Sequence, residues 1–164
     1  MITLASDLID LLQVQLTLER YASQAYSAFE SVCEAQSFSG FARWHHRAAK
    51  DERHHAALVR DFLIARNVAP LYDALDAVTL PVDYLSTFSA AQELEATVTS
   101  ALSDLYARAD EYGDPQVCRL ASDMLIEQRE SERELYDIVT RLQFALTCPA
   151  AILTLEQELG GSNG

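Results

Sequence analysis

The chain has 164 residues, the size of a single domain, and carries a formal net charge of −13, with 12 Lys and Arg against 25 Asp and Glu. Hydrophobic residues make up 49% of it and charged residues 23%, so a sizeable core is expected and disorder is excluded. The negative charge argues against binding to nucleic acid or to an anionic membrane, because clustered Lys and Arg supply that affinity. It is compatible with cations as ligands.

Cysteine usage and hydropathy indicate a soluble intracellular protein. The first helical segment is amphipathic, since Asp7 and Asp10 interrupt its apolar run, and no segment reaches the roughly 18 apolar residues of a membrane span. The three cysteines are scattered and lack a Cys-x-x-Cys spacing, which is typical of reduced thiols in a cytosolic protein. We therefore expect a cytoplasmic location.

Helical periodicity and the placement of glycine and proline divide the chain. Apolar residues recur at three- and four-residue steps without glycine or proline through the first 30 or so residues, which predicts a long helix. Ser37 is placed to cap the second helix, and Gly113-Asp114-Pro115 is typical of one helix ending and the next beginning. We expect a single domain over residues 1–164 with helices at about 5–34, 37–66, 83–112, 115–146 and 149–159.

The lengths of the connections predict the topology. The first and third connections hold only a few residues, so each joins two helices into an antiparallel hairpin. The connection 67–82 contains Pro70 and Pro81 and shows no period. Extended, it could reach roughly 50 Å, enough to run along a bundle. The expected fold is all-α: a four-helix bundle of two antiparallel hairpins joined by a long crossover, plus a short fifth C-terminal helix.

Each long helix carries a glutamate near its middle. Glu19 and Glu95 lie on apolar stripes of the first and third helices, and Glu127 lies on the fourth. On the second helix Glu52 is followed three residues later by His55, so both project from one face. Because Glu52 follows Glu19 by 33 residues and Glu127 follows Glu95 by 32, the four carboxylates are expected to meet at one level of the core.

Carboxylates gathered in a low-dielectric interior repel one another unless cations bind. Two divalent ions would balance four glutamates beside a neutral His55, and carboxylate with imidazole suits iron or manganese. A lone Glu on a helix is usually a solvated surface residue, and a lone Glu-x-x-His is usually chance. The paired positions together favour a metal site over that alternative.

Several short motifs, in order along the chain, resemble those of the ferritin family. They are QLTLERYASQAY (15–26), DERHHAA (51–57), LEATVTS (94–100), DPQVC (114–118) and EQRE (127–130). The resemblance covers about residues 7–160 and implies a ferritin-like bundle. It further implies that Glu19, Glu52 and His55 bind the first iron of a ferroxidase centre, and that Glu52 bridges to a second iron held by Glu95 and Glu127.

The resemblance assigns further residues around the centre. Gln128 matches a glutamine that hydrogen-bonds near the bridging oxygen. Tyr26 matches a tyrosine implicated in electron donation, the alternative being an ordinary core tyrosine. Asp51 and Glu130 resemble part of a third iron site, although Ser131 stands where that site has another acid. The alternative is that Asp51 and Glu130 are acids facing a cavity.

The same comparison implies a non-haem protein. Bacterioferritins and rubrerythrins carry a second Glu-x-x-His on the fourth helix, where this chain has Glu130 in place of the histidine. Bacterioferritins bind haem through a methionine directly after the second-helix glutamate, a position held here by Arg53. We therefore expect no haem. Two iron ions per subunit are expected, and a third only if Asp51 and Glu130 form an iron site and are not simply acids facing a cavity.

Other features bear on assembly and iron access. In animal ferritins the segment after DPxxC lines a three-fold channel with acids, but here Arg119 and Ser122 take those places, with Asp114 and Asp123 nearby. Iron is thus expected to use another route or a weaker three-fold one. The fifth helix resembles the one that gathers at four-fold axes of a 24-subunit cage, the alternative being a helix that packs on its own bundle.

Three residues early in the second helix are expected to lie away from the acid layer. They are a packing residue, Trp44, and two surface histidines, His45 and His46.

The expected function is iron storage and detoxification. Fe(II) would be oxidised with dioxygen or peroxide at the di-iron centre, and ferric mineral would be deposited inside a homo-oligomeric cage. One alternative is a non-storage di-iron oxidase or peroxidase of the same superfamily, and another is a metal-free helical adaptor with an acidic surface. No nucleic-acid or membrane partner is expected.

Overall fold

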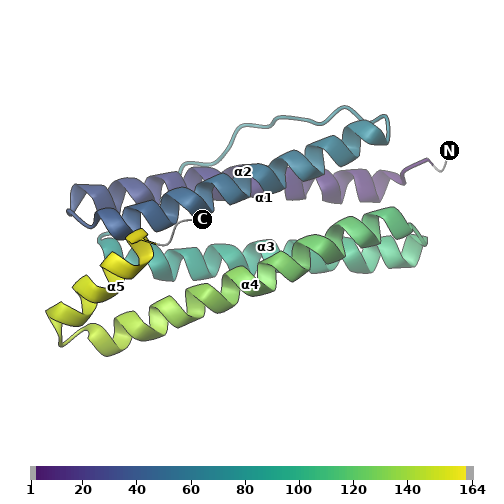
Figure 1. Cartoon of the computed structure of the whole chain (residues 1–164). Helices are drawn as coiled ribbons and strands as arrows, with labels where there is room; N and C mark the ends of the chain where they lie inside the picture. Colours follow the sequence, from purple (N-terminus) through teal and green to yellow (C-terminus); the bar gives the residue numbers. More distant parts are fainter. Residues whose placement is uncertain (1–2, 162–164) are drawn as a thin grey trace.

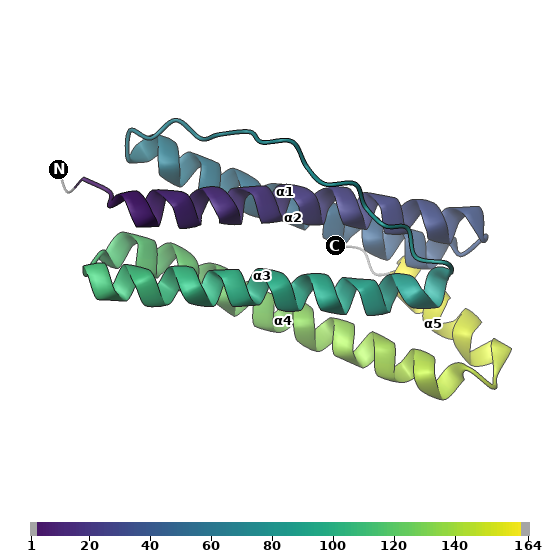
Figure 2. The same cartoon turned by 180° about the vertical axis from the view of Figure 1, so that it is seen from behind.

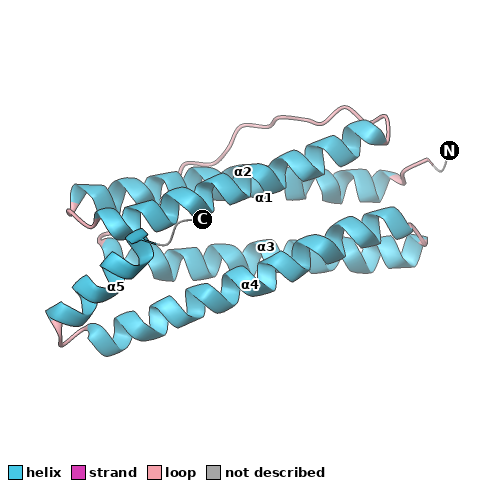
Figure 3. Ribbon diagram, in the orientation of Figure 1, coloured by secondary structure: helices cyan, strands magenta, loops and turns pink. Residues whose placement is uncertain are grey.

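The computed structural model describes residues 3–161, so the outermost residues of the expected domain, 1–2 and 162–164, lie outside it. Five helices account for all the regular secondary structure of the described chain, which contains no strand (Figure 3). They are α1 (Ser6–Ala35), α2 (Ser39–Ala65), α3 (Tyr84–Tyr112), α4 (Pro115–Ala145) and α5 (Pro149–Gly161) (Figure 1). Between residues 3 and 161, none of the helices is long and apolar enough to cross a membrane.

The predicted fold class is confirmed. The pairs α1 with α2 and α3 with α4 form two antiparallel hairpins, and the hairpins lie side by side to make a four-helix bundle (Figure 1). Residues 66–83 run back along the α1–α2 hairpin from the end of α2 to the start of α3 (Figure 2). Arg20 of α1 holds this crossover: Nη1 donates to the carbonyl oxygen of Asp73 at 3.1 Å, and the guanidinium stacks 4.9 Å from the centre of the Tyr72 ring.

The turn between α3 and α4 forms as the sequence predicts. Gly113 adopts a left-handed conformation (φ 64°) that ends α3, which a residue without Cβ does at little cost. The Asp114 carboxylate accepts hydrogen bonds from the backbone N–H groups of Gln116 and Val117, and Pro115 opens α4.

The prediction that Ser37 caps α2 is wrong. Ser37 has a φ of 67° and serves to end α1: its N–H donates to the carbonyl of Glu34, and the N–H of Phe38 donates to that of Cys33. The residue that precedes α2 is Phe38, and no side chain caps that helix. Ser37, which the sequence pattern predicts as the cap of α2, thus forms the left-handed turn that ends α1 instead.

The apolar core has two halves, one at each end of the bundle, with a polar layer between them. On α1 the buried apolar residues of one half end at Leu16 and those of the other begin at Ala25; on α4 the corresponding limits are Met124 and Leu135. The buried polar residues at or next to this level include Gln15, Glu19, Glu52, His55, Glu95 and Gln128. Burying carboxylates costs free energy unless something compensates their charge, so this layer points to a function.

Helix α5 folds back and packs against the first half of α2, burying Leu155 and Leu159 (Figure 1). The approach is close, because a Cβ on Gly40 would overlap the backbone carbonyl of Glu156. Two arginines of α2, one turn apart, donate to carbonyls at the end of α5: Arg43 Nε to Gly160 at 3.1 Å and Arg47 Nη2 to Leu159 at 2.7 Å. Within one chain, α5 therefore rests on its own bundle.

Candidate metal centre

Three predicted ligands lie together in the polar layer. Glu19 comes from α1, while Glu52 and His55 lie one turn apart on α2, and each offers a ligand atom within 4.8 Å of the others. Nδ1 of His55 is 3.2 Å from Oε2 of Glu52 and 4.0 Å from Oε2 of Glu19. All three side chains are buried, and Glu19 is completely so.

The electrostatics of this cluster fit a bound cation. Burial, followed by the neighbouring Glu52 carboxylate, raises the pKa of Glu19 well above its ordinary value. Burial also opposes a charged His55, but hydrogen bonds and charge from Glu52, with help from Glu19 and Glu127, outweigh it and raise the His55 pKa to about 10. Without a metal ion, an imidazolium would thus be the positive charge among these carboxylates.

One oxygen of Glu19 points to the same conclusion. Gln15 Nε2 donates to Oε1 of Glu19 at 2.6 Å, which orients the carboxylate. Among the described residues, Oε2 of Glu19 has no hydrogen-bond partner although it is buried. A buried acceptor without a donor, facing a histidine nitrogen and a second carboxylate, suits a hard or borderline cation such as Fe(II).

Glu95 of α3 forms the next part of the layer. Its carboxylate accepts hydrogen bonds from the Tyr26 hydroxyl and from Nε2 of Gln128, both of which are buried. Burial, followed by the charge of Glu52, raises the Glu95 pKa to about 7, while the two donors oppose the rise. Tyr26 and Gln128 therefore hold Glu95 in one orientation on the side facing Glu52.

Glu127 reaches the cluster from the solvent side. Oε2 of Glu127 lies 2.9 Å from Nε2 of His55, yet 56% of the Glu127 side chain is exposed. Glu127 is thus placed at the edge of the buried layer instead of inside it. The two candidates for a third ion, Asp51 and Glu130, are exposed on α2 and α4.

A cleft of 240 Å³ connects the layer with the surface between α2 and α4. Glu52 and Glu95 lie in its wall, together with Tyr26, Trp44, Arg47, Ala48, Asp51, Ser131 and Glu134. Trp44 is a buried packing residue as expected, but the prediction that it lies away from the acids is wrong. Its ring centre is 6.1 Å from that of Tyr26, and Nε1 donates to Oε1 of Glu134 at 2.8 Å.

The prediction that His45 is a surface residue is also wrong. His45 is fully buried against Tyr26, and its Nε2 lies 2.9 Å from Oγ1 of Thr87. Burial lowers the His45 pKa to about 3, so this imidazole is neutral. His46, the next residue, is exposed as expected and lies beside Glu30.

Comparison with known proteins identifies the family. The family model described as a ferritin-like domain matches residues 9–145, most of the chain. The chain belongs to the ferritin family. The matched segment covers α2, α3 and α4 completely and all of α1 except its first three residues, and it includes every candidate iron ligand.

Individual relatives agree with that assignment. The chain is similar to bacterial non-heme ferritins of Staphylococcus saprophyticus (31% identity, covering 79% of this chain and 78% of the relative) and of Staphylococcus aureus (27% identity, 96% and 95%). Among solved structures, it superposes on an open-pore ferritin from Archaeoglobus fulgidus with a TM-score of 0.94, at 24% identity and covering 98% and 99% of the two chains. This structural likeness supports the ferritin fold.

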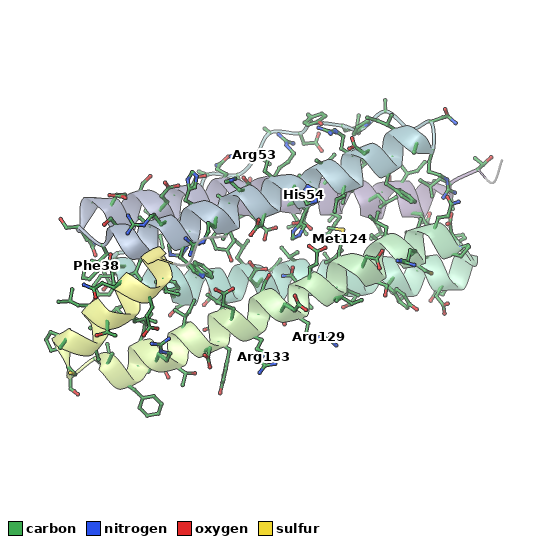
Figure 4. All side chains as sticks on the ribbon, viewed as in Figure 1. Phe38, Arg53, His54, Met124, Arg129 and Arg133 are labelled. Atoms are coloured by element: carbon green, nitrogen blue, oxygen red, sulfur yellow. The ribbon has the colours of Figure 1, made fainter. Side chains whose placement is uncertain are left out.

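Two departures from the family pattern can be located in this ferritin. Arg53, at the position of the haem-binding methionine of bacterioferritins, lies on the side of α2 facing the crossover, whereas Met124 points between the hairpins (Figure 4). Asp114, expected near a three-fold channel, is buried against Arg66, with Nη2 and Oδ2 2.8 Å apart. Asp114 also caps α4, so its carboxylate stabilises the fold through both contacts.

Proposed function

We propose that this ferritin oxidises Fe(II) to Fe(III), with dioxygen or peroxide as oxidant, at a di-iron centre in the polar layer. The ferric product is stored as mineral inside a cage. The observation that carries the proposal is the buried cluster of Glu19, Glu52 and His55, in which Oε2 of Glu19 lacks a donor. The relatives described as bacterial non-heme ferritins support it.

In this proposal Glu19, Glu52 and His55 hold the first iron ion. Glu52 bridges to the second, which takes Glu95 and the partly exposed Glu127 as its other ligands. The support is positional: Glu52 adjoins Glu19 and His55 on one side and acts electrostatically on Glu95 on the other. A carboxylate-rich pocket stabilises Fe(III) more than Fe(II) because the ferric ion carries the higher charge.

The neighbouring residues have separate tasks. Gln128 and Tyr26 orient Glu95 through their hydrogen bonds. In this proposal Tyr26 also donates an electron, the role that the family resemblance implies. His55 gives up a proton when iron binds, since the metal ligand is the neutral imidazole. Asp51 and Glu130, which are both exposed, would hold a third ion.

We further propose a homo-oligomer, a 24-subunit cage located in the cytoplasm, without haem. The relatives described as bacterial non-heme ferritins and the position of Arg53 support the absence of haem. The closely packed α5 is available to form contacts around a four-fold axis.

The test is aerobic oxidation of Fe(II), followed by ferric absorbance, in the wild type and in Glu52→Gln. The variant keeps the shape of the side chain but removes the bridging charge, so we expect the initial rate to fall about a hundredfold or more. Glu93→Gln is the matched control, because Glu93 lies on the exposed face of α3 two residues from Glu95. Equal rates for Glu52→Gln and the wild type would contradict the proposal.

Chromatography and mineral loading separate the alternatives. A cage-sized species that retains ferric mineral supports storage. A much smaller species that oxidises Fe(II) without retaining iron would indicate a non-storage di-iron oxidase. A melting temperature that does not respond to anaerobic Fe(II) would indicate a metal-free adaptor, because an ion that binds only the folded chain stabilises it.

A further inference from the structure

Arg47 of α2 lies where the end of α5 meets the cleft between α2 and α4. Among the described residues that line this cleft it is the one basic side chain. The acids that line the cleft are Asp51, Glu52, Glu95 and Glu134. The guanidinium of Arg47 nevertheless binds to α5, because Nη2 donates to the backbone carbonyl of Leu159 at 2.7 Å.

A matched pair of residues on α4 shows that this choice of partner is unusual. Arg119 and Asp123 are four residues apart, and Nε of the arginine lies 2.7 Å from Oδ2 of the aspartate. Arg47 and Asp51 have the same spacing on α2, but within the described chain no ion pair joins Arg47 to Asp51 or to Glu134. The residue types and the spacing are the same, so the difference lies in α5, whose end takes the guanidinium.

The end of α5 is a good partner for a cation. The last carbonyl groups of a helix lack partners within the helix and carry the negative end of its dipole. Arg43, one turn before Arg47, donates to the carbonyl of Gly160 in the same way, at 3.1 Å. The buried side chains of Leu155 and Leu159 hold α5 against the bundle. Arg47 is therefore positioned by a helix that is itself anchored in the core.

The position of this one cation changes the charge of the cleft. While α5 holds the guanidinium, the carboxylates of Asp51 and Glu134 are not neutralised by it, and a cleft lined by acids concentrates divalent cations. When α5 moves away, Arg47 is free to pair with Asp51 one turn along the same helix. Its positive charge then stands in the cleft and repels an incoming divalent ion.

We infer that Arg47 gates the passage of Fe(II) through the cleft, and that α5 positions Arg47 in the open state. The inference rests on the proposed ferroxidase function in taking Fe(II) as the ion that passes. Arg47 binds no iron itself and acts only through the charge of the cleft. A movement of α5 is thereby converted into a change in the rate at which iron reaches Glu52 and Glu95.

The glycines at the contact allow α5 to be displaced in the full-length chain. A Cβ on Gly40 would overlap the backbone carbonyl of Glu156, and a Cβ on Gly160 would lie 2.8 Å from Cα of Gly40. A Cβ on Gly161 has no described atom within 4 Å. Gly40→Leu and Gly160→Leu should thus release α5 from the two sides of the contact, and Gly161→Leu is the matched control. Hydrogen exchange of the α5 amides measures the release.

The test measures how fast the assembled, metal-free protein binds Co(II) without air, from the visible absorbance of the bound ion, and then the initial rate of aerobic Fe(II) oxidation. At low salt, release of α5 should slow Co(II) binding about fivefold and raise the KM for Fe(II) by a similar factor at unchanged kcat. Damage to the centre itself would lower kcat. The effect should shrink at high salt, which screens the charge of Arg47.

Arg47→Gln identifies the residue responsible. Combined with Gly40→Leu or Gly160→Leu, it should restore the wild-type rate of Co(II) binding although α5 stays released, because a neutral amide does not repel the ion. Arg43→Gln in the same background is the matched control. Arg43 also donates to the end of α5 but does not line the cleft, so this change should not restore the rate.

If the leucine variants fail to assemble, Gly40→Ala and Gly160→Ala replace them, since they carry the same Cβ. Wild-type Co(II) binding with α5 released would overturn the inference, and so would slow binding that persists in the presence of Arg47→Gln. Unchanged hydrogen exchange of α5 in both variants would remove the contact on which it depends. A wild type that shows the expected Co(II) pattern but oxidises no Fe(II) would contradict the proposed function and leave Arg47 as a gate for divalent cations.

Discussion

His55 bridges the two hairpins of the bundle. Its Nε2 lies 2.9 Å from Oε2 of Glu127 on α4, while its Nδ1 lies 3.2 Å from Oε2 of Glu52 on its own helix. One imidazole therefore contacts a buried and a partly exposed carboxylate, and their charges, with that of Glu19, keep it protonated at neutral pH.

The first prediction concerns proton release on iron binding. Because the His55 pKa is about 10 and iron needs the neutral ring, binding at pH 7 must displace this proton. Lowering the pH adds competing protons, so the Fe(II) affinity should fall as the pH falls, by up to about tenfold per pH unit for each proton displaced. Anaerobic calorimetry in buffers of different ionisation enthalpy measures the number released.

His55→Gln should release about one proton fewer than the wild type and bind more weakly. His54→Gln is the matched control, since His54 is the adjacent, exposed histidine. Equal proton release by His55→Gln and the wild type would contradict the assignment of His55 as a charged residue displaced by metal.

The second prediction separates Glu127 from Glu52. Glu127 is half exposed and is proposed to bind only the second ion, so Glu127→Gln should retain the first Fe(II) and weaken the second. The initial oxidation rate should fall about tenfold, equivalent to about 1.4 kcal/mol in the barrier. Glu52→Gln should lower the affinity for both Fe(II) ions. Anaerobic titration of bound Fe(II) distinguishes the two patterns, and loss of both ions from Glu127→Gln would show that Glu127 is not a ligand of the second ion alone.

The third prediction concerns acid stability and His45. Burial lowers the pKa of His45 in the folded chain to about 3, whereas in the unfolded chain it is near 6.5, so between these values the unfolded chain binds a proton that the folded chain does not. Stability contributed by the neutral ring is complete above pH 6.5 and is lost as the pH falls towards 3. Between these two pH values, this group lowers the free energy of unfolding by about 1.4 kcal/mol for each pH unit of acidification.

His45→Phe should remove that slope, because phenylalanine has no proton to bind and suits the surrounding aromatic rings. Denaturant unfolding at several pH values and a fixed protein concentration gives the free energy of unfolding of each protein. The difference between variant and wild type at each pH isolates the contribution of His45. His46→Gln serves as the exposed control. A pH profile that is the same for His45→Phe and the wild type would refute the prediction.

The fourth prediction concerns the buried ion pair between Arg66 and Asp114. Their side chains are 9% and 8% exposed, and Asp114 also caps α4. Asp114→Ala removes both contributions and should lower the free energy of unfolding by about 3–5 kcal/mol. Asp114→Asn keeps an acceptor for the cap and should cost less. Glu111→Ala, which removes the exposed pair with Arg108, should change stability by less than about 1 kcal/mol. An Asp114→Ala cost no larger than that control would be inconsistent with the structure.

Much of the fold could be predicted from the sequence because the bundle repeats simple local rules. A 3.6-residue period marks each long helix, and Gly113, Asp114 and Pro115 each act through their own backbone or side chain. The two-hairpin topology follows from connection lengths alone. The sequence does not distinguish the two roles open to Ser37, because a left-handed turn and a helix cap favour similar short polar residues and only the tertiary path decides between them.

The sequence predicts which residues form the candidate site better than it predicts how deeply each of them is buried. Apolar stripes locate Glu19 and Glu95, and the spacing to His55 locates Glu52; all three glutamates are buried. Glu127 lies on the same level but at the edge of the bundle, because periodicity gives the face of a helix and not its distance from solvent.

His45 and Trp44 could have been recognised from spacing. His45 lies seven residues before Glu52, two helical turns away on the same face, and this spacing places it inside with the glutamate. Trp44 lies eight residues before Glu52, close to the same face. The bond from Trp44 to Glu134 joins residues 90 apart in sequence, and no local pattern carries that information.

The central claim is that carboxylates from the four long helices, three of them buried and Glu127 partly exposed, together hold a pair of iron ions. Anomalous scattering at the iron edge, from crystals soaked anaerobically in Fe(II), tests it most directly. We expect one iron among Glu19, Glu52 and His55 and a second among Glu52, Glu95 and Glu127. Iron found only at surface carboxylates, with these side chains free of metal, would contradict the account.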